Sequence, residues 1–323
     1  MFIRILIPCF NESQVLHHMY EQLSDILSVD SQLQQYQYDI LFVDDGSTDD
    51  TLTIIRQFAH VNRKVKYISF SRNFGKEAAM YAGLKESNAV DALVIIDSDL
   101  QHPPELIPQM INAYTQGYHQ VVACRDRTGE QQWRKRLTKL YYGTINRLID
   151  VSLMDGVGDF RLLSQKAVHA VLSLSEYNRF SKGIFAWIGF APKVIHYQNK
   201  IRVNGVSKWS FKQLFNYAID GLLSFNNKPL RSLIYIGTLI LIFSFIYIIV
   251  SLVDAVLYGI QTPGYFTTIF AITFLGSIQL VSIGIIGEYI GRIYYEVKHR
   301  PLYIVNTTNL LKAEVAKNES VKE

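Results

Sequence analysis

The sequence predicts an α/β domain with a doubly wound, mostly parallel sheet, followed by interfacial amphipathic helices and two transmembrane helices. In the first 125 residues, short segments rich in Ile, Val and Leu alternate with segments of helical periodicity. Strands this apolar are typical of parallel sheets that are covered on both faces. Two long uncharged segments follow near the C-terminal end. Together these observations predict an α/β architecture first and membrane helices last.

Five strands and four helices are expected in the α/β part. The strand segments are Phe2–Ile7, Tyr38–Val43, Val65–Phe70, Ala92–Ile96 and Gln120–Cys124. The helical segments are 13–28, 49–60, 75–87 and 104–116, and the pairs Asp49-Asp50 and Pro103-Pro104 are start signals for two of them. In a sheet of this class, ligands bind beyond the carboxyl ends of the strands. The residues that follow each strand are therefore the first to inspect.

The two uncharged segments are long enough to cross a bilayer. They extend from Ser232 to Val253 and from Tyr265 to Gly287. At a rise of ~1.5 Å per residue, each helix spans the ~30 Å of a hydrocarbon core. Small residues such as Gly276, Ser277 and Gly284 let helices approach closely in lipid, so we expect a hairpin.

Charge placement predicts the orientation of this hairpin. The segment 254–264 between the two spans has no Lys or Arg, whereas basic residues flank both outer ends: Lys228, Arg231, Arg292, Lys298 and Arg300. The positive-inside rule then places both termini and the α/β domain in the cytoplasm. Because Pro8 comes so early, we expect no secretory signal peptide, and the two cysteines, Cys9 and Cys124, suit a reducing compartment. We expect a multi-pass protein of the plasma membrane.

The composition is that of an ordered protein with an apolar excess. Of 323 residues, 49% are hydrophobic and 19% are charged, and 32 basic against 28 acidic residues give a net charge of +4. These values exclude a disordered chain and a disulfide scaffold. The mild positive charge predicts no nucleic-acid partner, but it suits contact with membrane lipids where basic residues cluster.

Polar and mainly acidic side chains follow each of the first four strands. The segments are Pro8–Glu12, Asp44–Asp49, Ser71–Lys76 and Asp97–Gln101. Acids in such places can simply cap helices, and we interpret Asp49 and Asp50 in this way. Capping does not account for Asp97 and Asp99, because two carboxylates one residue apart repel each other unless a cation offsets them. Such oxygen ligands suit Mg²⁺ or Mn²⁺ shared with a diphosphate.

Several common site motifs are absent from the sequence. There is no P-loop, no C-x-x-C or H-E-x-x-H zinc pattern and no G-x-S-x-G elbow. The only G-x-G, at Gly156 to Gly158, follows no clear strand and continues without a third glycine. The sequence therefore predicts none of the usual sites for a dinucleotide, a nucleoside triphosphate, zinc or a serine nucleophile.

Six ordered motifs between residues 8 and 210 resemble glycosyltransferase family 2 on its GT-A fold. Four carry the family resemblance: PCFNE at 8–12, VDDGSTDDT at 43–51, SRNFGKEAA at 71–79 and DSDLQHPPE at 97–105. GDFRLLS at 158–164 and RVNGVSKWS at 202–210 are similar to the polyprenyl-phosphate branch, which contains dolichol-phosphate mannose synthases and bacterial undecaprenyl-phosphate sugar transferases. The C-terminal spans match the bacterial subgroup, which implies a bacterial plasma membrane.

The resemblance implies a reaction. A single hexose or N-acetylhexosamine would pass, with inversion, from a nucleotide diphosphate sugar to polyprenyl phosphate on the cytoplasmic face, for cell-surface glycan modification. One alternative is a processive transferase, or one that uses a non-lipid acceptor. Processive relatives carry Q-x-x-R-W where this chain has Gly205 to Trp209, and two spans are too few for an export channel. Another alternative is a non-catalytic membrane scaffold of a glycan-export complex. The sugar, the nucleotide (UDP or GDP) and homo-oligomer formation stay open.

The resemblance also implies residue roles. Residues that would bind the nucleotide sugar are Pro8, Phe10, Glu12, Asp44, Asp45, Lys76 and Asp97. Metal ligands for Mg²⁺ or Mn²⁺ would be Asp97, Asp99 and Gln101, and the catalytic set would be Asp97, Asp99, Asp159 and Arg161. Lys76 either offers charge to the donor phosphates or is a solvated residue at a helix start. Asp159 either orients the attacking phosphate or stabilises the transition state, or it pairs with Arg161 to fix a loop.

The acceptor, a lipid phosphate, is already anionic at pH 7 and needs cations and orientation more than a base. By resemblance, Arg125 and Arg134 would bind this phosphate, with Lys139 a weaker candidate. The segment 133–148 forms a basic amphipathic stripe that suits a membrane surface, or alternatively a core helix with a solvated face. A second amphipathic segment, 210–226, leads into the first span.

The predicted organisation has four parts. Residues 1–125 form the nucleotide-sugar-binding part and residues 126–227 the acceptor side with interfacial helices. Residues 228–291 form the transmembrane hairpin, and residues 292–323 form a cytoplasmic tail.

Overall fold

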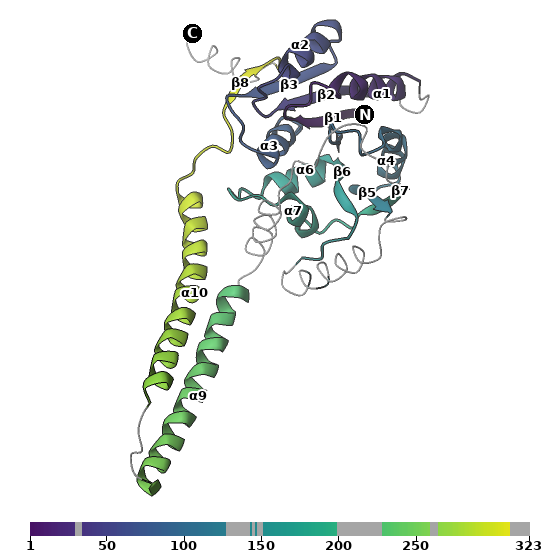
Figure 1. Cartoon of the computed structure of the whole chain (residues 1–323). Coiled ribbons are helices and arrows are strands. Elements are labelled where there is room, and N and C mark those ends of the chain that lie inside the picture. Colours follow the sequence, from purple (N-terminus) through teal and green to yellow (C-terminus); the bar gives the residue numbers. More distant parts are fainter. Residues whose placement is uncertain are drawn as a thin grey trace, which may run out of the picture.

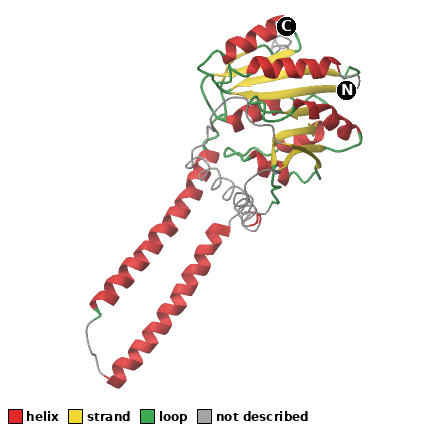
Figure 2. Cartoon of the chain, turned by 45° about the vertical axis from the view of Figure 1, so that its right-hand side comes forward, coloured by secondary structure: helices red, strands yellow, loops and turns green. Residues whose placement is uncertain are grey.

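The computed structural model describes residues 1–29, 34–126, 143, 146, 151–198, 228–258 and 264–310. They form an α/β domain and two long helices that extend away from it side by side, as Figures 1 and 2 both show. The residue ranges 133–142 and 199–227, which contain most of the two expected interfacial helices, lie outside the described residues.

An eight-stranded mixed sheet forms the centre of the domain. Its strands are β1 (Phe2–Cys9), β2 (Gln37–Asp44), β3 (Val65–Phe70), β4 (Ala92–Ile95), β5 (Gln120–Asp126), β6 (Val157–Ser164), β7 (Lys193–Gln198) and β8 (Val305–Thr308). Their order is β7-β5-β6-β4-β1-β2-β3-β8. The pairs β1–β2, β1–β4, β2–β3 and β5–β7 are parallel, whereas β6 and β8 run antiparallel to their neighbours. The predicted mostly parallel sheet is confirmed.

Helices cover both faces of the sheet. They are α1 (Leu16–Val29), α2 (Thr51–Val61), α3 (Lys76–Glu86), the 3₁₀ turn η1 (Pro104–Leu106), α4 (Ile107–Thr115), α6 (Gln165–Leu172) and α7 (Ser181–Trp187). The first apolar core joins α1, α2 and α4 to one face of the strands, and the second joins α3, α6 and α7 to the other. Alternation along β1 shows this division, because Ile5 packs in the first core and Leu6 in the second. Burial on both faces explains why these strands lack a polar side.

Two sequence expectations differ from the structure in detail. The expected helix 104–116 begins with the 3₁₀ turn η1 and continues as α4 to Thr115. Directly after Gly156 the structure has β6, a strand that the sequence did not predict. The sequence analysis also missed β7 and β8, and β8 lies in the segment expected to be a tail.

The long helices are α9 (Lys228–Tyr258) and α10 (Tyr265–Val297). Their described apolar side chains are largely exposed, Phe243 and Ile283 among them. Among the described residues, one stretch, Ala271–Val297, is long and apolar enough to cross a membrane, and a shorter apolar stretch, Tyr235–Tyr247, lies in α9. A paired helical hairpin is therefore present, and its apolar surface has no cover from the domain.

The chain returns to the domain after α10. The ring of Tyr303 stacks on Phe70 at a centroid distance of 4.8 Å, and β8 then adds to the edge of the sheet next to β3. At the end of α10, the Tyr295 ring stacks on Tyr177 at 5.5 Å, and Glu296 Oε1 accepts a hydrogen bond from the Tyr177 backbone N–H. The last turn of α10 and the segment beyond it are thus fixed to the domain.

Candidate active site

The carboxyl ends of β1 to β4 surround a cavity of about 700 Å³, which we call the edge cavity. It is lined by Pro8, Cys9, Phe10, Glu12, Asp45, Asn73, Gly75, Lys76, Ala79, Asp97, Ser98, Asp99 and Gln101. Most of the residues predicted from the sequence to bind a nucleotide sugar or a metal are in this set. The structure therefore brings together residues from four separate strand ends, as the parallel sheet predicted.

Lys76 is the centre of the charged part of the edge cavity. Its ammonium Nζ lies 2.6 Å from Asp97 Oδ1 and 2.6 Å from Asp159 Oδ2, so one cation joins the end of β4 to β6. Burial alone would lower the pKa of Lys76, but the charges of Asp159 and Asp97 raise it above its usual range. The lysine is therefore charged at neutral pH. The sequence analysis left its role open between a donor contact and a solvated helix start.

Both carboxylates of this cluster are ionised at neutral pH. Burial would raise the pKa of Asp97, but the Lys76 charge and the contact with His102 lower it. The pKa of Asp159 is also lowered. Burial alone would raise it, but the charge of Lys76 outweighs burial. The mutual repulsion of Asp97 and Asp159 is thus offset by the ammonium of Lys76.

His102 supports Asp97 from the other side. Its Nε2 lies 3.6 Å from Asp97 Oδ2, and its Nδ1 lies 2.7 Å from the hydroxyl oxygen of Tyr197 in β7. Because Asp97 only accepts, the tautomer with its proton on Nε2 suits this contact, and it leaves Nδ1 to accept the Tyr197 O–H. Burial raises the pKa of Tyr197 to about 12, so this hydroxyl keeps its proton. The sequence analysis missed both residues, although His102 lies inside the quoted 97–105 motif.

Asp99 and Gln101 lie on a tight turn after β4. Gln101 N–H donates to Asp99 Oδ1 at 3.2 Å, and Leu100 between them has a φ of +57°, in the left-handed region. Among the described residues, no group of three or more His, Cys, Asp or Glu side chains has metal-binding geometry. The oxygens of Asp97, Asp99 and Gln101 are hard donors, and two carboxylates completed by substrate phosphates are how Mg²⁺ is usually held. These residues therefore fit a divalent cation that shares its ligands with a diphosphate.

Asp44 and Asp45 at the end of β2 are engaged with the protein itself. Asp45 Oδ1 and Oδ2 accept hydrogen bonds from the backbone N–H groups of Phe74 at 2.7 Å and Gly75 at 2.9 Å. Asp44 Oδ2 accepts from Ser69 Oγ at 2.7 Å. These bonds fasten the loop before α3, which places Lys76. Both side chains are buried, but Asp45 lines the edge cavity, whereas Asp44 lines a different cavity of about 410 Å³.

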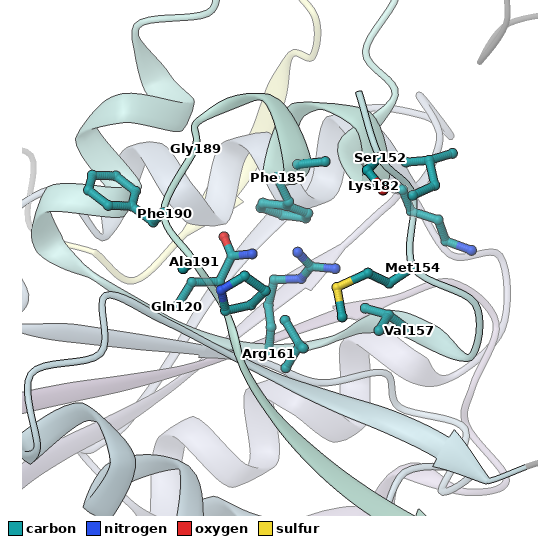
Figure 3. A pocket seen from close by; sticks show the side chains of 14 residues that line it. Gln120, Ser152, Met154, Val157, Arg161, Lys182, Phe185, Gly189, Phe190 and Ala191 are labelled. Carbon is teal, nitrogen blue, oxygen red and sulfur yellow. The ribbon is translucent and has the colours of Figure 1, made fainter. Parts of the chain in front are cut away.

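The predicted cations on the acceptor side fall into two groups. Arg125 lies in β5 opposite Tyr197 in β7 and is described, whereas Arg134 and Lys139 lie outside the described residues. Arg161, predicted to be catalytic, is only 2% exposed, and its guanidinium lies 3.7 Å from the centre of the Phe185 ring. Arg161 lines a separate cavity against α7 (Figure 3). Asp159 and Arg161 are therefore directed to different neighbours.

Comparison with known proteins shows the class of this protein. The sequence matches the family described as "Glycosyl transferase family 2" over residues 4–172, and the "GtrB C-terminal hairpin" over residues 228–293. A GT-A-type sheet with carboxylates at its carboxyl edge, followed by this hairpin, defines an enzyme that transfers sugars. The chain belongs to glycosyltransferase family 2.

Relatives cover nearly the whole chain. A Bacillus subtilis protein named as a glycosyltransferase, CsbB, is 50% identical over 99% of this chain and 96% of its own length. The bactoprenol glucosyl transferase of Shigella phage SfV is 39% identical over 94% of this chain and 98% of its own. A solved glucosyl-3-phosphoglycerate synthase from Mycobacterium tuberculosis is 20% identical with a TM-score of 0.43, covering 69% of this chain and 79% of its own. That last likeness is too distant to assign residues.

Proposed function

We propose that this enzyme transfers a single hexose or N-acetylhexosamine, with inversion, from a nucleotide diphosphate sugar to the phosphate of a polyprenyl carrier. The observation that carries this proposal is the edge cavity, in which Lys76 joins Asp97 and Asp159 beside Asp99. Relatives named bactoprenol glucosyl transferase, similar along almost their full length, support the carrier as acceptor.

The donor would bind at the carboxyl ends of β1 and β2. Pro8, Phe10 and Glu12 line the edge cavity on this side and would contact the base and ribose, with Asp45 behind them. Asp97, Asp99 and Gln101 would hold Mg²⁺ or Mn²⁺ on the diphosphate. When bound there, the ion supplies positive charge that stabilises the diphosphate as it leaves.

Lys76 would act with the same group of residues. Its ammonium lies 2.6 Å from Asp97 Oδ1, on the side of the cavity that the metal ligands occupy. Its raised pKa keeps it charged, so it can attract the donor phosphates without a proton transfer. Asp159 would hold the ammonium in place as the donor binds. An ionised Asp159 is not needed as a general base, because the acceptor phosphate is already an anion.

The acceptor would approach from the side of β5 and β6. Arg125 at the end of β5 would attract its phosphate, together with Arg134 and Lys139, which lie outside the described residues. The hairpin of α9 and α10 would cross the bacterial plasma membrane with both chain ends in the cytoplasm. Its exposed apolar residues and the fixed end of α10 support this arrangement, since they keep the domain close to the lipid headgroups.

Incorporation of label into lipid tests the proposal. Membranes that contain the protein are incubated with undecaprenyl phosphate and each of a panel of labelled UDP- and GDP-sugars, and the organic extract is counted. We expect one donor to label a lipid product that carries one sugar. Absence of labelled lipid with every donor contradicts the proposed acceptor. A product with several sugars would favour a processive enzyme, and labelling that does not depend on the presence of the protein would favour a scaffold.

A further inference from the structure

Lys76 reaches the acids of the edge cavity through a long and flexible side chain. Its ammonium lies between Asp97 and Asp159, so its position depends on where the first turn of α3 holds the lysine backbone. The chain before the lysine is fixed, because the Asp45 carboxylate accepts hydrogen bonds from the two backbone N–H groups that precede it. The chain after the lysine is fixed by a different contact.

Glu77, the next residue along α3, is bound to the first residue of α7. Its Oε1 and Oε2 both accept from the Ser181 backbone N–H at 3.2 Å, and Oε2 also accepts from the Ser181 hydroxyl. Ser181 is only 4% exposed, so water competes little for these bonds. They join the first turns of α3 and α7 although 104 positions separate the two residues in the sequence.

The segment 174–180, which leads to Ser181, is itself anchored. Arg179 in this segment is 9% exposed, and its Nη1 donates to the Leu174 backbone carbonyl at 2.6 Å. The Arg179 guanidinium also lies 4.6 Å from the centre of the Tyr81 ring in α3. The same segment contacts the last turn of α10, as described above. Ser181 is therefore a fixed point against which the start of α3 can be held.

Glu77 and Ser181 are both outside the edge cavity. Glu77 lines a neighbouring cavity of about 320 Å³, which shares Asn73 and Gly75 with the edge cavity, and Ser181 lines neither. A donor bound in the edge cavity would therefore not touch these two side chains. Any effect that they have on the reaction has to act through the lysine beside them.

We propose that Glu77 and Ser181 are positioning residues for Lys76. Asp45 holds the chain before the lysine, and Ser181, through Glu77, holds the chain after it. The ammonium can then turn from Asp159 toward a diphosphate by rotation of its own side chain, while its backbone stays in place. Without the bonds to Ser181, the first turn of α3 shifts and the ammonium is no longer centred between the two acids. The inference rests on the proposed function and adds two residues to it.

Thermal unfolding of paired variants tests the positioning without any turnover. The full-length protein in detergent is held at pH 8, above the value of about 7 to which burial raises the pKa of Glu77, so that its carboxylate is ionised. Lys76→Met is made alone and in the Ser181→Ala background. We expect Lys76→Met to lower Tm about half as much in the Ser181→Ala background as alone, since residues that act through one another have non-additive effects.

Ser173→Ala is the matched control for this comparison. It also removes one serine hydroxyl, whose Oγ donates to the Ala170 backbone carbonyl at 2.7 Å at the end of α6. In that background Lys76→Met should lower Tm by the full amount. Glu77→Gln, which loses one acceptor oxygen, replaces Ser181→Ala if that variant does not fold, and should give the same reduced fall. A full fall in the test background, or no fall in any background, would overturn the inference.

Transfer kinetics show whether the lysine position matters for the reaction. With the donor that the unaltered protein uses, Ser181→Ala should lower kcat/KM about tenfold, but by less than about twofold in the Lys76→Met background. Ser173→Ala should leave kcat/KM unchanged. A tenfold loss in both backgrounds would mean that Ser181 acts independently of Lys76, which overturns the inference. Absence of transfer by the unaltered protein, with the coupling in Tm intact, would instead contradict the proposed function alone.

Discussion

Two acidic pairs lie at the same edge of the sheet, and they are neutralised in different ways. Asp44 and Asp45, after β2, accept hydrogen bonds from backbone N–H groups and from Ser69, all of which are fixed parts of the fold. Asp97 and Asp159, at the ends of β4 and β6, share the ammonium of Lys76, whose side chain is 42% exposed. The first pair is bound to the backbone, and the second to a flexible side chain at the cavity surface.

This difference separates structural from reactive acids. Backbone donors cannot leave without disrupting the loop, so Asp44 and Asp45 keep these hydrogen bonds and can offer a ligand only their remaining lone pairs. A lysine side chain can rotate toward an incoming diphosphate and leave Asp97 to a metal ion. The kind of group that neutralises a carboxylate, more than its acidity or location, therefore indicates which acids can change partners when a substrate or a metal binds.

The largest expected effect is the loss of transfer in Asp97→Asn. This change removes one carboxylate from the proposed metal site and should lower kcat by about 100-fold to 1,000-fold, the usual cost of losing one electrostatic stabiliser of the transition state. Transfer of labelled sugar to polyprenyl phosphate measures it. Asp25→Asn, at an exposed position on α1, is the control and should retain activity. Equal kcat in both variants would place Asp97 outside the reaction.

The next largest effect is expected for Lys76→Met. Without the ammonium, Asp97 and Asp159 repel each other, so activity should fall about 100-fold and Tm should drop. Because the carboxylates then lack a cation, Mn²⁺ should raise the Tm of the variant more than that of the unaltered protein. Lys76→Arg, which keeps the charge, should respond to Mn²⁺ like the unaltered protein. The same Mn²⁺ response in all three would show that Lys76 and a metal do not share these acids.

Asp45→Asn tests the structural pair. The amide offers one acceptor oxygen in place of two, so either Phe74 or Gly75 loses its hydrogen bond. We expect a loss of about 1–3 kcal/mol in the free energy of unfolding, measured by thermal unfolding in detergent, and a smaller fall in kcat than for Asp97→Asn. Asp50→Asn serves as the control, since the Asp50 side chain makes no capping bond to α2. A fall in kcat as large as that of Asp97→Asn would remove the distinction between the pairs.

The smallest effect concerns Glu77, which lies beside Lys76 and accepts hydrogen bonds from Ser181. Burial raises the pKa of Glu77 to about 7. A carboxyl group with a raised pKa in the folded state is most favourable when protonated, so stability should fall as pH rises from about 4.5 through 7. Between pH 6 and 8 this amounts to about 1 kcal/mol.

Glu77→Gln should flatten this pH dependence, which Tm measured from pH 5 to pH 8 would show. The matched control is Glu86→Gln at the other end of α3, which should leave the dependence unchanged. If Glu77→Gln keeps the full pH dependence of Tm, another titratable group causes it.

The apolar runs in the sequence predicted the strands that are buried in the core. The strand expected over 65–70 coincides with β3, and the other four differ by a few residues at their ends. Three strands were missed because their sequences lack an uninterrupted apolar run. β6 contains Asp159 and Arg161 within an otherwise apolar run, β7 is largely outside the core, and the four residues of β8 pair only because the chain returns from α10.

The position of the site residues at one edge of the sheet was predicted, but the contacts between them were not. Carboxyl-end placement was enough to group Pro8, Asp45 and Asp97, since parallel strands bring such residues together. The contact between Lys76 and Asp159 joins residues 83 positions apart, and no local pattern encodes it. The same is true of the contact between His102 and Tyr197, which depends on the position of β7.

The edge position of β8 has a mechanical consequence. β7, the last described strand before the hairpin, and β8, the first strand after it, form opposite edges of the same sheet, so the hairpin is joined in sequence to both edges of the domain. A body held by one tether can swivel, whereas one held at two separated points keeps a single face toward its support. Cutting the backbone between α10 and β8 would leave the domain with one tether and allow it to swivel. The cut would also expose the unpaired edge of β3 to other chains.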